Sequence, residues 1–213
     1  MNQGGVVARA RTAILISGRG SNMAALLAAA ADPAYPAEIV LVLSNRADAG
    51  GLAHAESRGI PTAIIPSRGR DRAAFEHAME DELARHDVAL IALAGFMRVL
   101  GEGFVTRWQG RMVNIHPSLL PAFPGLDTHA RALAAGVARH GCTVHLVSSG
   151  VDEGPILAQA SVPVLADDTP QSLGARVLAE EHRLYPATLA MLARRLANPL
   201  PALSPLPRTP GKT

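Results

Sequence analysis

Short apolar runs alternate with helix-like patterns along most of the chain. The runs are β-branched or continuously apolar, which is typical of strands covered on both faces of a parallel sheet. They lie at 12–17, 38–44, 61–66, 88–94 and 111–116. Between them, in stretches such as 22–31 and 71–86, apolar residues recur at helical spacing, which predicts crossover helices. The pattern predicts an α/β fold of the Rossmann-like kind, with a mostly parallel central sheet and helices on both faces.

The pattern continues toward the C-terminus. Residues 143–147, TVHLV, predict a further strand, and Thr169 followed by Pro170 is a favourable helix start, with an N-cap and a proline at the first helical position. From Asn198 onward, prolines are too frequent for either element. We therefore expect a single domain over residues 1–213, with its core at about 12–195 and flexible tails at 1–10 and 198–213.

Composition and charge argue against several classes of protein. Hydrophobic residues make up 48% of the chain, yet no apolar run approaches the roughly 18 residues that cross a bilayer, and the first residues lack the apolar segment of a secretory signal. The only cysteine, Cys142, fits a reducing compartment, so we expect a cytoplasmic protein without membrane association. The formal net charge is only +2 and the arginines are scattered among acids, so we expect no nucleic-acid partner. Lys212 is the only lysine, which argues against a Schiff-base lysine or a P-loop.

The segment SGRGSN, residues 17–22, follows the first predicted strand and leads directly into a helix. In a parallel sheet, ligands bind outside the carboxyl ends of the strands. The glycines allow a tight turn, and the backbone amides of Gly20, Ser21 and Asn22 would then point from a helix N-terminus at a bound anion, which suggests a phosphate cradle. A plain glycine turn with a Ser or Asn cap is the alternative. A dinucleotide fingerprint fits less well, because its third glycine would fall at Met23 and no acid ends the second strand.

The segment VNIHPSLLP, residues 113–121, carries two polar side chains in an apolar strand. Residues two apart share a face, so Asn114 and His116 project together while their neighbours point into the core. Pro117 cannot continue the ladder, which ends the strand at the carboxyl edge of the sheet. An amide there can donate to a developing oxyanion, and an imidazole can act as a general acid or base. The alternative is a buried Asn and His that bond only to loop backbone.

A third candidate lies in the glycine-rich loop VSSGVDEGPIL, residues 147–157. The preceding strand is expected to end at the same carboxyl edge, so the carboxylate of Asp152 could face His116; the alternative is a solvated loop acid. No metal site is expected from Cys142 and His145, because residues three apart on a strand point to opposite faces.

Five motifs occur in order along the chain. They are SGRGSN (17–22), LAGFMRVL (93–100), NIHPSLLP (114–121), HLV with VDEGPIL (145–157) and AEEHRLYP (179–186). Together they resemble the phosphoribosylglycinamide formyltransferase family, over about residues 12–192. The resemblance implies transfer of a formyl group from the co-substrate 10-formyltetrahydrofolate to the primary amine of glycinamide ribonucleotide, in purine biosynthesis and without a metal.

The resemblance also implies roles for individual residues. The catalytic Asn, His and Asp of the family match Asn114, His116 and Asp152. The ribonucleotide-binding residues match Gly20, Ser21, Asn22 and Glu181. The folate-binding residues match Arg72, Met97, Arg98, Val99, Leu100 and Asn114. One departure is Asp127, where some members carry a histidine, although His129 is present.

The expected chemistry agrees with these residue types. Attack of an amine on an N-formyl carbon gives a tetrahedral oxyanion, which Asn114 and a protonated His116 could stabilise. His116 could also protonate the leaving folate nitrogen, and an Asp152 carboxylate beside it would raise the pKa of His116 and keep it an acid. No covalent enzyme intermediate is required.

Two related enzymes and one binding function are alternatives. A transfer-RNA formyltransferase and a formyl-folate hydrolase share the Asn-x-His and the later Asp, but each carries an added domain for which we expect no room in 213 residues. A nucleotide-binding module that uses only the glycine loop leaves Asn114 and His116 unexplained. We expect a monomer or a weak homodimer.

Overall fold

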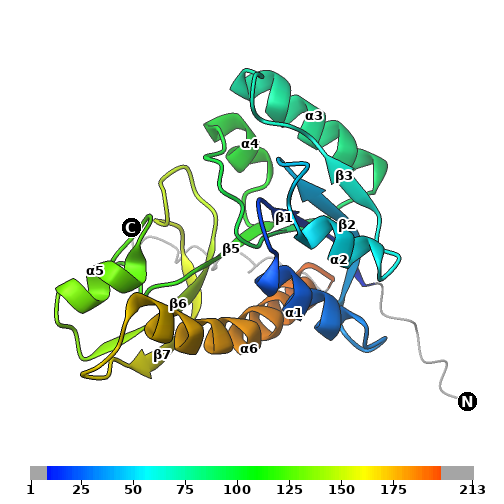
Figure 1. Cartoon of the computed structure of the whole chain (residues 1–213). Helices are drawn as coiled ribbons and strands as arrows, with labels where there is room; N and C mark the ends of the chain where they lie inside the picture. Colours follow the sequence, from blue (N-terminus) through cyan, green and yellow to red (C-terminus); the bar gives the residue numbers. More distant parts are fainter. Residues whose placement is uncertain (1–8, 198–213) are drawn as a thin grey trace, which may run out of the picture.

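A seven-stranded sheet forms the centre of the computed structural model, which describes residues 9–197 (Figure 1). The strand order is β3-β2-β1-β4-β5-β6-β7. The strands are β1 Ala10–Ile16, β2 Ala37–Ser44, β3 Thr62–Ile64, β4 Leu90–Leu93, β5 Met112–His116, β6 Arg139–Leu146 and β7 Ile156–Pro163. The first five are parallel, whereas β6 is antiparallel to β5 and β7 is antiparallel to β6. The expected mostly parallel α/β sheet is therefore confirmed.

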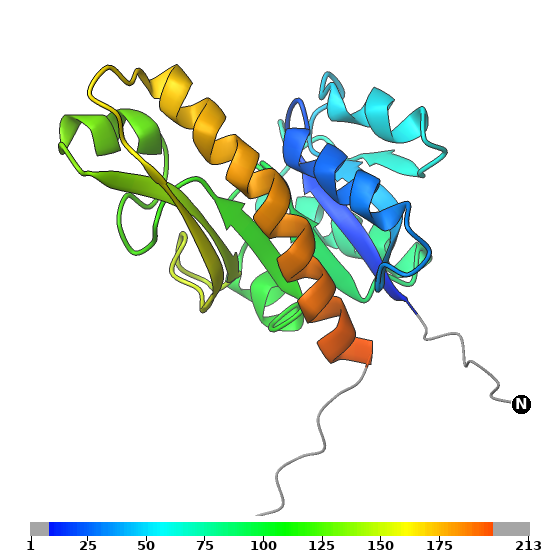
Figure 2. The ribbon, with the colours of Figure 1, turned by 90° about the horizontal axis from the view of Figure 1, so that it is seen from below.

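Six helices within residues 9–197 cover the two faces of this sheet. They are α1 Ser21–Ala30, α2 Gly51–Glu56, α3 Arg72–Arg85, α4 Glu102–Arg107, α5 Thr128–Ala134 and α6 Pro170–Ala197. Helices α1, α2 and α6 share one apolar core with the sheet, and α3 and α4 share a second core on the other face. Figure 2 shows α6 running diagonally across its face beside α1. The prediction of helices on both faces is confirmed.

Strand β1 shows how the sequence produces two cores. Ile14 and Ile16 belong to the core with α1 and α6, whereas Ala13 and Leu15 belong to the core with α3 and α4. All four side chains are fully buried. Because successive side chains of a strand point to opposite faces, a strand covered on both sides must be apolar at every position. This requirement explains the continuous apolar runs of the central strands.

Several elements differ from the expectation. The apolar pattern does not predict β7, because this strand lies at the edge of the sheet and Val162 is its only fully buried residue. Helices α2, α4 and α5 span only six or seven residues, too few to show a clear helical period. The start of α6 is as predicted, since Thr169 Oγ1 accepts a hydrogen bond from the Ser172 amide at 3.1 Å.

The fold begins within the N-terminal segment that was expected to be a tail. Strand β1 begins at Ala10, and the Arg9 side chain donates to the carbonyls of Ala30 and Ala37 at 2.8 Å, so the fold starts earlier than the expected tail at 1–10 allows. The expected C-terminal tail at 198–213 lies outside the described residues. Over residues 9–197, none of the helices has the combined length and apolar character of a membrane span.

Candidate active site

Strand β5 carries Asn114 and His116 on one face. Val113 and Ile115 point the other way into the core shared with α6, as the alternation predicts. Asn114 lies beside Leu93, the last residue of β4, so His116 extends past the end of that strand. The strand ends at His116, immediately before Pro117. The two polar side chains therefore lie together at the carboxyl edge, as predicted.

Asp152 meets His116, although not by the expected route. Strand β6 runs antiparallel to β5, so its carboxyl end lies beside the amino end of β5 and not at the common carboxyl edge. The expectation that this strand ends at the carboxyl edge was wrong, because the parallel pairing stops at β5. The loop between β6 and β7 instead folds back over the sheet, and Asp152 Oδ2 lies 3.2 Å from His116 Nδ1. The backbone at Asp152 adopts a left-handed conformation with φ of 58°.

The Asp152 carboxylate is nearly buried and ionised. Its side chain is 11% exposed, and Oδ2 also accepts the Gly125 amide at 2.9 Å. Burial opposes ionisation, but the neighbouring His145, the Gly125 amide and His116 together hold the pKa of Asp152 below its usual value. The other His116 nitrogen, Nε2, lies 3.0 Å from the Phe123 carbonyl. Both ring nitrogens of His116 therefore lie within hydrogen-bond distance of oxygen atoms.

His145 lies beside Asn114, a contact that strand alternation alone does not predict. It pairs across the sheet with Asn114, and its Nε2 lies 3.2 Å from Asn114 Nδ2. Its Nδ1 lies 2.9 Å from the Leu146 carbonyl, which can only accept, so Nδ1 donates this hydrogen bond. Asp152 Oδ1 is farther away, at 3.6 Å. Only the register between β5 and β6 reveals this contact.

The glycine loop after β1 turns directly into helix α1. Gly20 is the N-cap of α1 with φ of 73°, in the left-handed region. A Cβ at this position would lie 3.1 Å from Met23 Cε and 3.2 Å from Gly51 Cα, so only glycine fits without strain. The first amides of a helix lack intrahelical acceptors, and those of Ser21 and Asn22 begin α1.

Glu181 of α6 meets this loop. The Asn22 side chain donates from Nδ2 to Glu181 Oε2 at 2.5 Å, which brings together two residues predicted for the ribonucleotide site. Glu181 is 6% exposed, and burial raises the pKa of its carboxyl against the opposing effect of Asn22. A hydrogen bond between residues far apart in sequence thus joins α6 to the start of α1.

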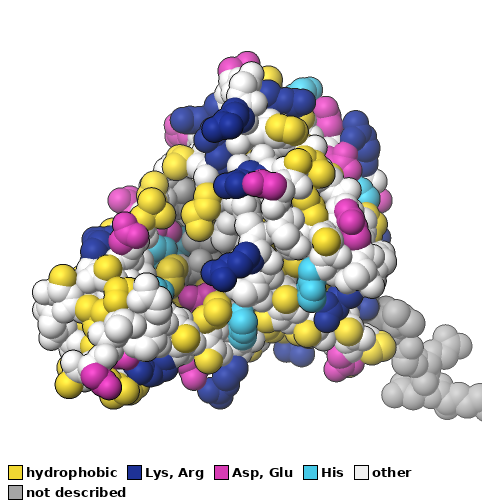
Figure 3. Space-filling model, viewed as in Figure 1, with side chains coloured by type: hydrophobic (Ala, Val, Ile, Leu, Met, Phe, Trp, Pro, Cys, Tyr) yellow, Lys and Arg dark blue, Asp and Glu magenta, His cyan; other side chains and the backbone are white. Residues whose placement is uncertain are grey.

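The loop after β4 contains the predicted folate residues. Met97, Arg98 and Val99 are exposed, whereas Leu100 is buried. Arg72, the first residue of α3, lies close by, because its Cδ would be 3.3 Å from a Cβ built at Gly101. A pocket of about 620 Å³ adjoins the loop and is lined by Met97 and Arg98 together with Ser17, Asn45, Arg46, Ala47, Asp48, Pro66, Ser67 and Arg68. Figure 3 shows this face of the molecule hollowed between α3 and α4 on one side and α5 with β6 and β7 on the other.

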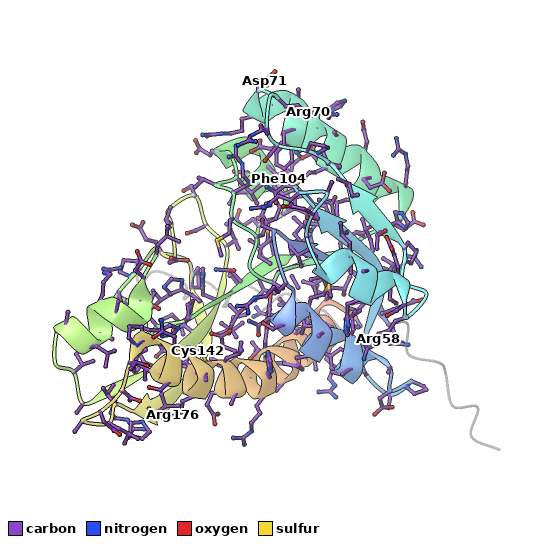
Figure 4. The ribbon with its side chains drawn as sticks, viewed as in Figure 1. Arg58, Arg70, Asp71, Phe104, Cys142 and Arg176 are labelled. Carbon is purple, nitrogen blue, oxygen red and sulfur yellow. The ribbon has the colours of Figure 1, made fainter. Side chains whose placement is uncertain are left out.

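The remaining candidates lie apart from these contacts. Asp127 is the N-cap residue of α5 in a left-handed conformation, but its exposed side chain does not cap the helix. Cys142, labelled beneath α6 in Figure 4, is buried, and burial raises the pKa of its thiol to about 12. Within residues 9–197, no cluster of three or more His, Cys, Asp or Glu side chains is arranged to hold a metal ion.

Comparison with known proteins identifies the family. The model of the formyl transferase family matches residues 10–189, which include the whole sheet and every site residue described above. The chain belongs to the formyl transferase family. A phosphoribosylglycinamide formyltransferase from Escherichia coli is 42% identical over 181 residues, which cover 84% of this chain and 85% of that protein. The corresponding protein of Bacillus subtilis is 39% identical over 84% of this chain and 93% of its own length.

Two further comparisons extend this result. The crystal structure of a phosphoribosylglycinamide formyltransferase from Brucella melitensis superimposes with a TM-score of 0.84 at 54% identity, covering 87% of this formyl transferase and 96% of that chain. The trifunctional purine biosynthetic protein adenosine-3 of Bos taurus is 46% identical over 186 residues. This formyl transferase spans only 18% of the length of that protein.

Proposed function

We propose that this formyl transferase moves the formyl group of 10-formyltetrahydrofolate to the amine of glycinamide ribonucleotide, giving formylglycinamide ribonucleotide and tetrahydrofolate for purine biosynthesis. The observation that carries the proposal is the contact of His116 with Asp152 at the end of β5, on the strand that also carries Asn114. It occurs in a chain related over most of its length to proteins named for this reaction. We also propose a cytoplasmic enzyme that acts as one domain, as a monomer or weak homodimer, without nucleic-acid or membrane partners.

The proposed chemistry begins with attack of the amine on the formyl carbon. A carbon–nitrogen bond forms and the formyl oxygen becomes an oxyanion. One Asn114 Nδ2–H is directed to His145, which leaves the second for the oxyanion. His145 therefore supports the proposal by fixing the orientation of the Asn114 amide.

The intermediate then collapses as the bond to the folate nitrogen breaks. That nitrogen needs a proton, and His116 Nε2–H is the donor we propose, exchanging its Phe123 carbonyl acceptor for the folate. The Asp152 carboxylate stabilises the charged imidazole through Nδ1. The amine loses one proton as the amide forms, so the reaction moves one proton in total from the amine to the folate nitrogen.

Substrate binding follows from the two loops. The amides of Gly20, Ser21 and Asn22 would hold the ribonucleotide phosphate, with Glu181 contacting the same substrate beside Asn22. Arg72, residues 97–100 and Asn114 would hold the folate, because the loop after β4 offers exposed backbone groups and apolar walls suited to a flat heterocycle.

A direct assay tests this function. The protein is mixed with glycinamide ribonucleotide and 10-formyltetrahydrofolate, and formylated ribonucleotide is measured by mass spectrometry. We expect product with the wild type and with His77→Gln, which changes a histidine that is 78% exposed on α3, and a loss of roughly 10²-fold or more with His116→Asn. Release of formate without a formylated ribonucleotide would instead identify a hydrolase, and absence of both products would refute the proposal.

A further inference from the structure

The loop after β4 is held at both ends by side chains of other elements. At its start, the Met97 amide donates to Ser17 Oγ at 2.8 Å. Just after its end, the Gly101 amide donates to Glu76 Oε1 at 2.6 Å. Glu76 belongs to α3, more than one turn after Arg72, and lies 25 residues before Gly101. Two hydrogen bonds from distant elements thus bracket residues 97–100.

Three of the four side chains at 97–100 contribute little anchoring of their own. Phe96 and Leu100 pack into the core shared with α3 and α4, but the three residues between them are exposed, with Met97 at 64% and Val99 at 61%. An exposed segment without regular backbone pairing takes its conformation from its ends. The position of this loop therefore depends on the few contacts that fix those ends.

We propose that Glu76 is a positioning residue for the folate-binding loop and that it sets the affinity for the folate. The inference rests on the proposed function of this loop. A hydrogen bond from a backbone amide to a carboxylate is shorter and stronger than one between neutral groups, and the Gly101 bond has the expected short length.

Close packing at Gly101 couples the loop to Arg72. A Cβ on Gly101 would lie 3.0 and 3.1 Å from the two Glu76 carboxylate oxygens and 3.3 Å from Arg72 Cδ. Because residues four apart on a helix are neighbours on its surface, Arg72 and Glu76 approach Gly101 from the same face of α3. Loss of the Glu76 carboxylate would consequently make both the end of the loop and the Arg72 side chain less well ordered.

Glu80 provides a matched comparison on the same helix. It lies one turn after Glu76 and pairs with Arg107 at the far end of α4, with Arg107 Nε 2.5 Å from Glu80 Oε1. Both acids therefore connect α3 to the segment around α4, but only Glu76 contacts the end of the loop. A general weakening of the contact between α3 and α4 would follow from either substitution, whereas a positioning role belongs to Glu76 alone.

Kinetics of Glu76→Ala, Glu76→Gln and Glu80→Ala test the inference. We expect Glu76→Ala to raise the KM for 10-formyltetrahydrofolate by about tenfold, equivalent to about 1.4 kcal/mol, with kcat and the KM for glycinamide ribonucleotide within about twofold of wild type. Glu76→Gln should stay within about twofold throughout, because its amide oxygen still accepts from Gly101. Glu80→Ala should do the same.

Other outcomes would overturn the inference. These are an unchanged folate KM in Glu76→Ala, an equal rise in Glu80→Ala, or failure of Glu76→Gln to restore the wild-type value. Calorimetric binding of tetrahydrofolate provides a test that does not depend on turnover. If the wild type binds tetrahydrofolate but transfers no formyl group, the proposed reaction fails while the Glu76 prediction is still decided by the binding constants. If the wild type does not bind it, both proposals fail.

Discussion

At the scale of single residues, Asp152 connects the separate parts of the site. Its carboxylate contacts His116 from β5, lies near His145 from β6 and accepts the Gly125 amide from the loop before α5. These neighbours outweigh the effect of burial and lower the pKa of Asp152, so the carboxylate stays ionised at every pH above its ordinary range near ~4. A permanent negative charge therefore lies next to the His116 ring under working conditions.

Asp152→Asn keeps the shape of this side chain and removes its charge. We expect kcat to fall by roughly 10²-fold or more, because the imidazolium loses its counter-charge. Steady-state rates of the wild type and the variant check this effect. Near-normal turnover would show that Asp152 only shapes its loop.

His140 links stability to pH. The ring is 1% exposed and its Nε2 lies 3.2 Å from Nδ1 of His129. Burial first, and then His129, lower the pKa of His140 to about 4, against the opposing bond to the Pro117 carbonyl. A histidine in an unfolded chain titrates near ~6.5, so the unfolded state binds more protons between these two values. The contribution of His140 to stability is thus fully present above pH ~6.5 and is lost as the pH falls toward 4.

His140→Gln should flatten this dependence. We expect the wild-type free energy of unfolding to decrease on acidification from pH 7 to 4.5, with His140 contributing up to on the order of 3 kcal/mol, and the variant to lose less. Denaturant titrations at several pH values give the slope of the unfolding free energy against pH for each protein. These slopes, and not the absolute stabilities, are compared. His77→Gln, which changes an exposed histidine, should keep the wild-type slope. Equal slopes for wild type and His140→Gln would contradict the assignment.

At the scale of elements, α6 connects the strands that carry the site. The hydroxyl of its fully buried Tyr185 lies 2.9 Å from the Leu93 carbonyl and 3.2 Å from the Val113 carbonyl, at the point where β4 ends and β5 continues. The same helix carries Glu181, which accepts from Asn22 at the start of α1. A single long helix therefore fixes the glycine loop after β1 and strand β5 relative to each other.

Helix α1 begins after Gly20, where we propose that the ribonucleotide phosphate binds. Gly20→Val would force a branched side chain into a left-handed backbone and against Met23 and Gly51. We expect affinity for glycinamide ribonucleotide to fall by about tenfold or more, with tetrahydrofolate affinity changed by less than about threefold. Calorimetry with each ligand separately measures both. Gly18→Ala is the matched control in the same loop, because a Cβ there meets nothing within 4 Å. Equal losses for the two ligands would remove the phosphate assignment.

At the scale of the whole molecule, the strand order brings the candidate site together. Strands β1, β4 and β5 are neighbours, and the order reverses direction between β1 and β4. Loops that leave adjacent strands on opposite sides of such a reversal open a crevice at the carboxyl edge. The glycine loop after β1, the loop at 97–100 after β4 and the end of β5 lie at this edge around the reversal.

The sheet, both cores and all candidate site residues lie within residues 9–197. Because the proline-rich composition of 198–213 predicts a tail without regular structure, we expect a protein truncated after Ala197 to keep the melting temperature within about 2 °C and kcat/KM within about twofold. Thermal unfolding and the formyl-transfer assay check this expectation. A large loss of either would show that residues beyond Ala197 belong to the functional domain.

The sequence by itself determined the parallel part of the fold and most of the candidate site. Continuous apolar runs follow from burial on both faces, and Asn114 and His116 share a face because side chains alternate along a strand. These are local consequences of backbone geometry, so five strands and their polar ends were predictable. The same reasoning located Gly20 at a helix start.

Only the tertiary structure decided how distant segments meet. The local sequence pattern does not predict the antiparallel direction of β6 or the path of the loop around Asp152. Strand direction depends on how the connection between the strands packs. For the same reason, the pairing of His145 with Asn114, the bond from Asn22 to Glu181 and the contact of Glu76 with Gly101 required the folded chain. Hydrogen bonds between residues far apart in sequence depend on register and packing, which no single segment contains.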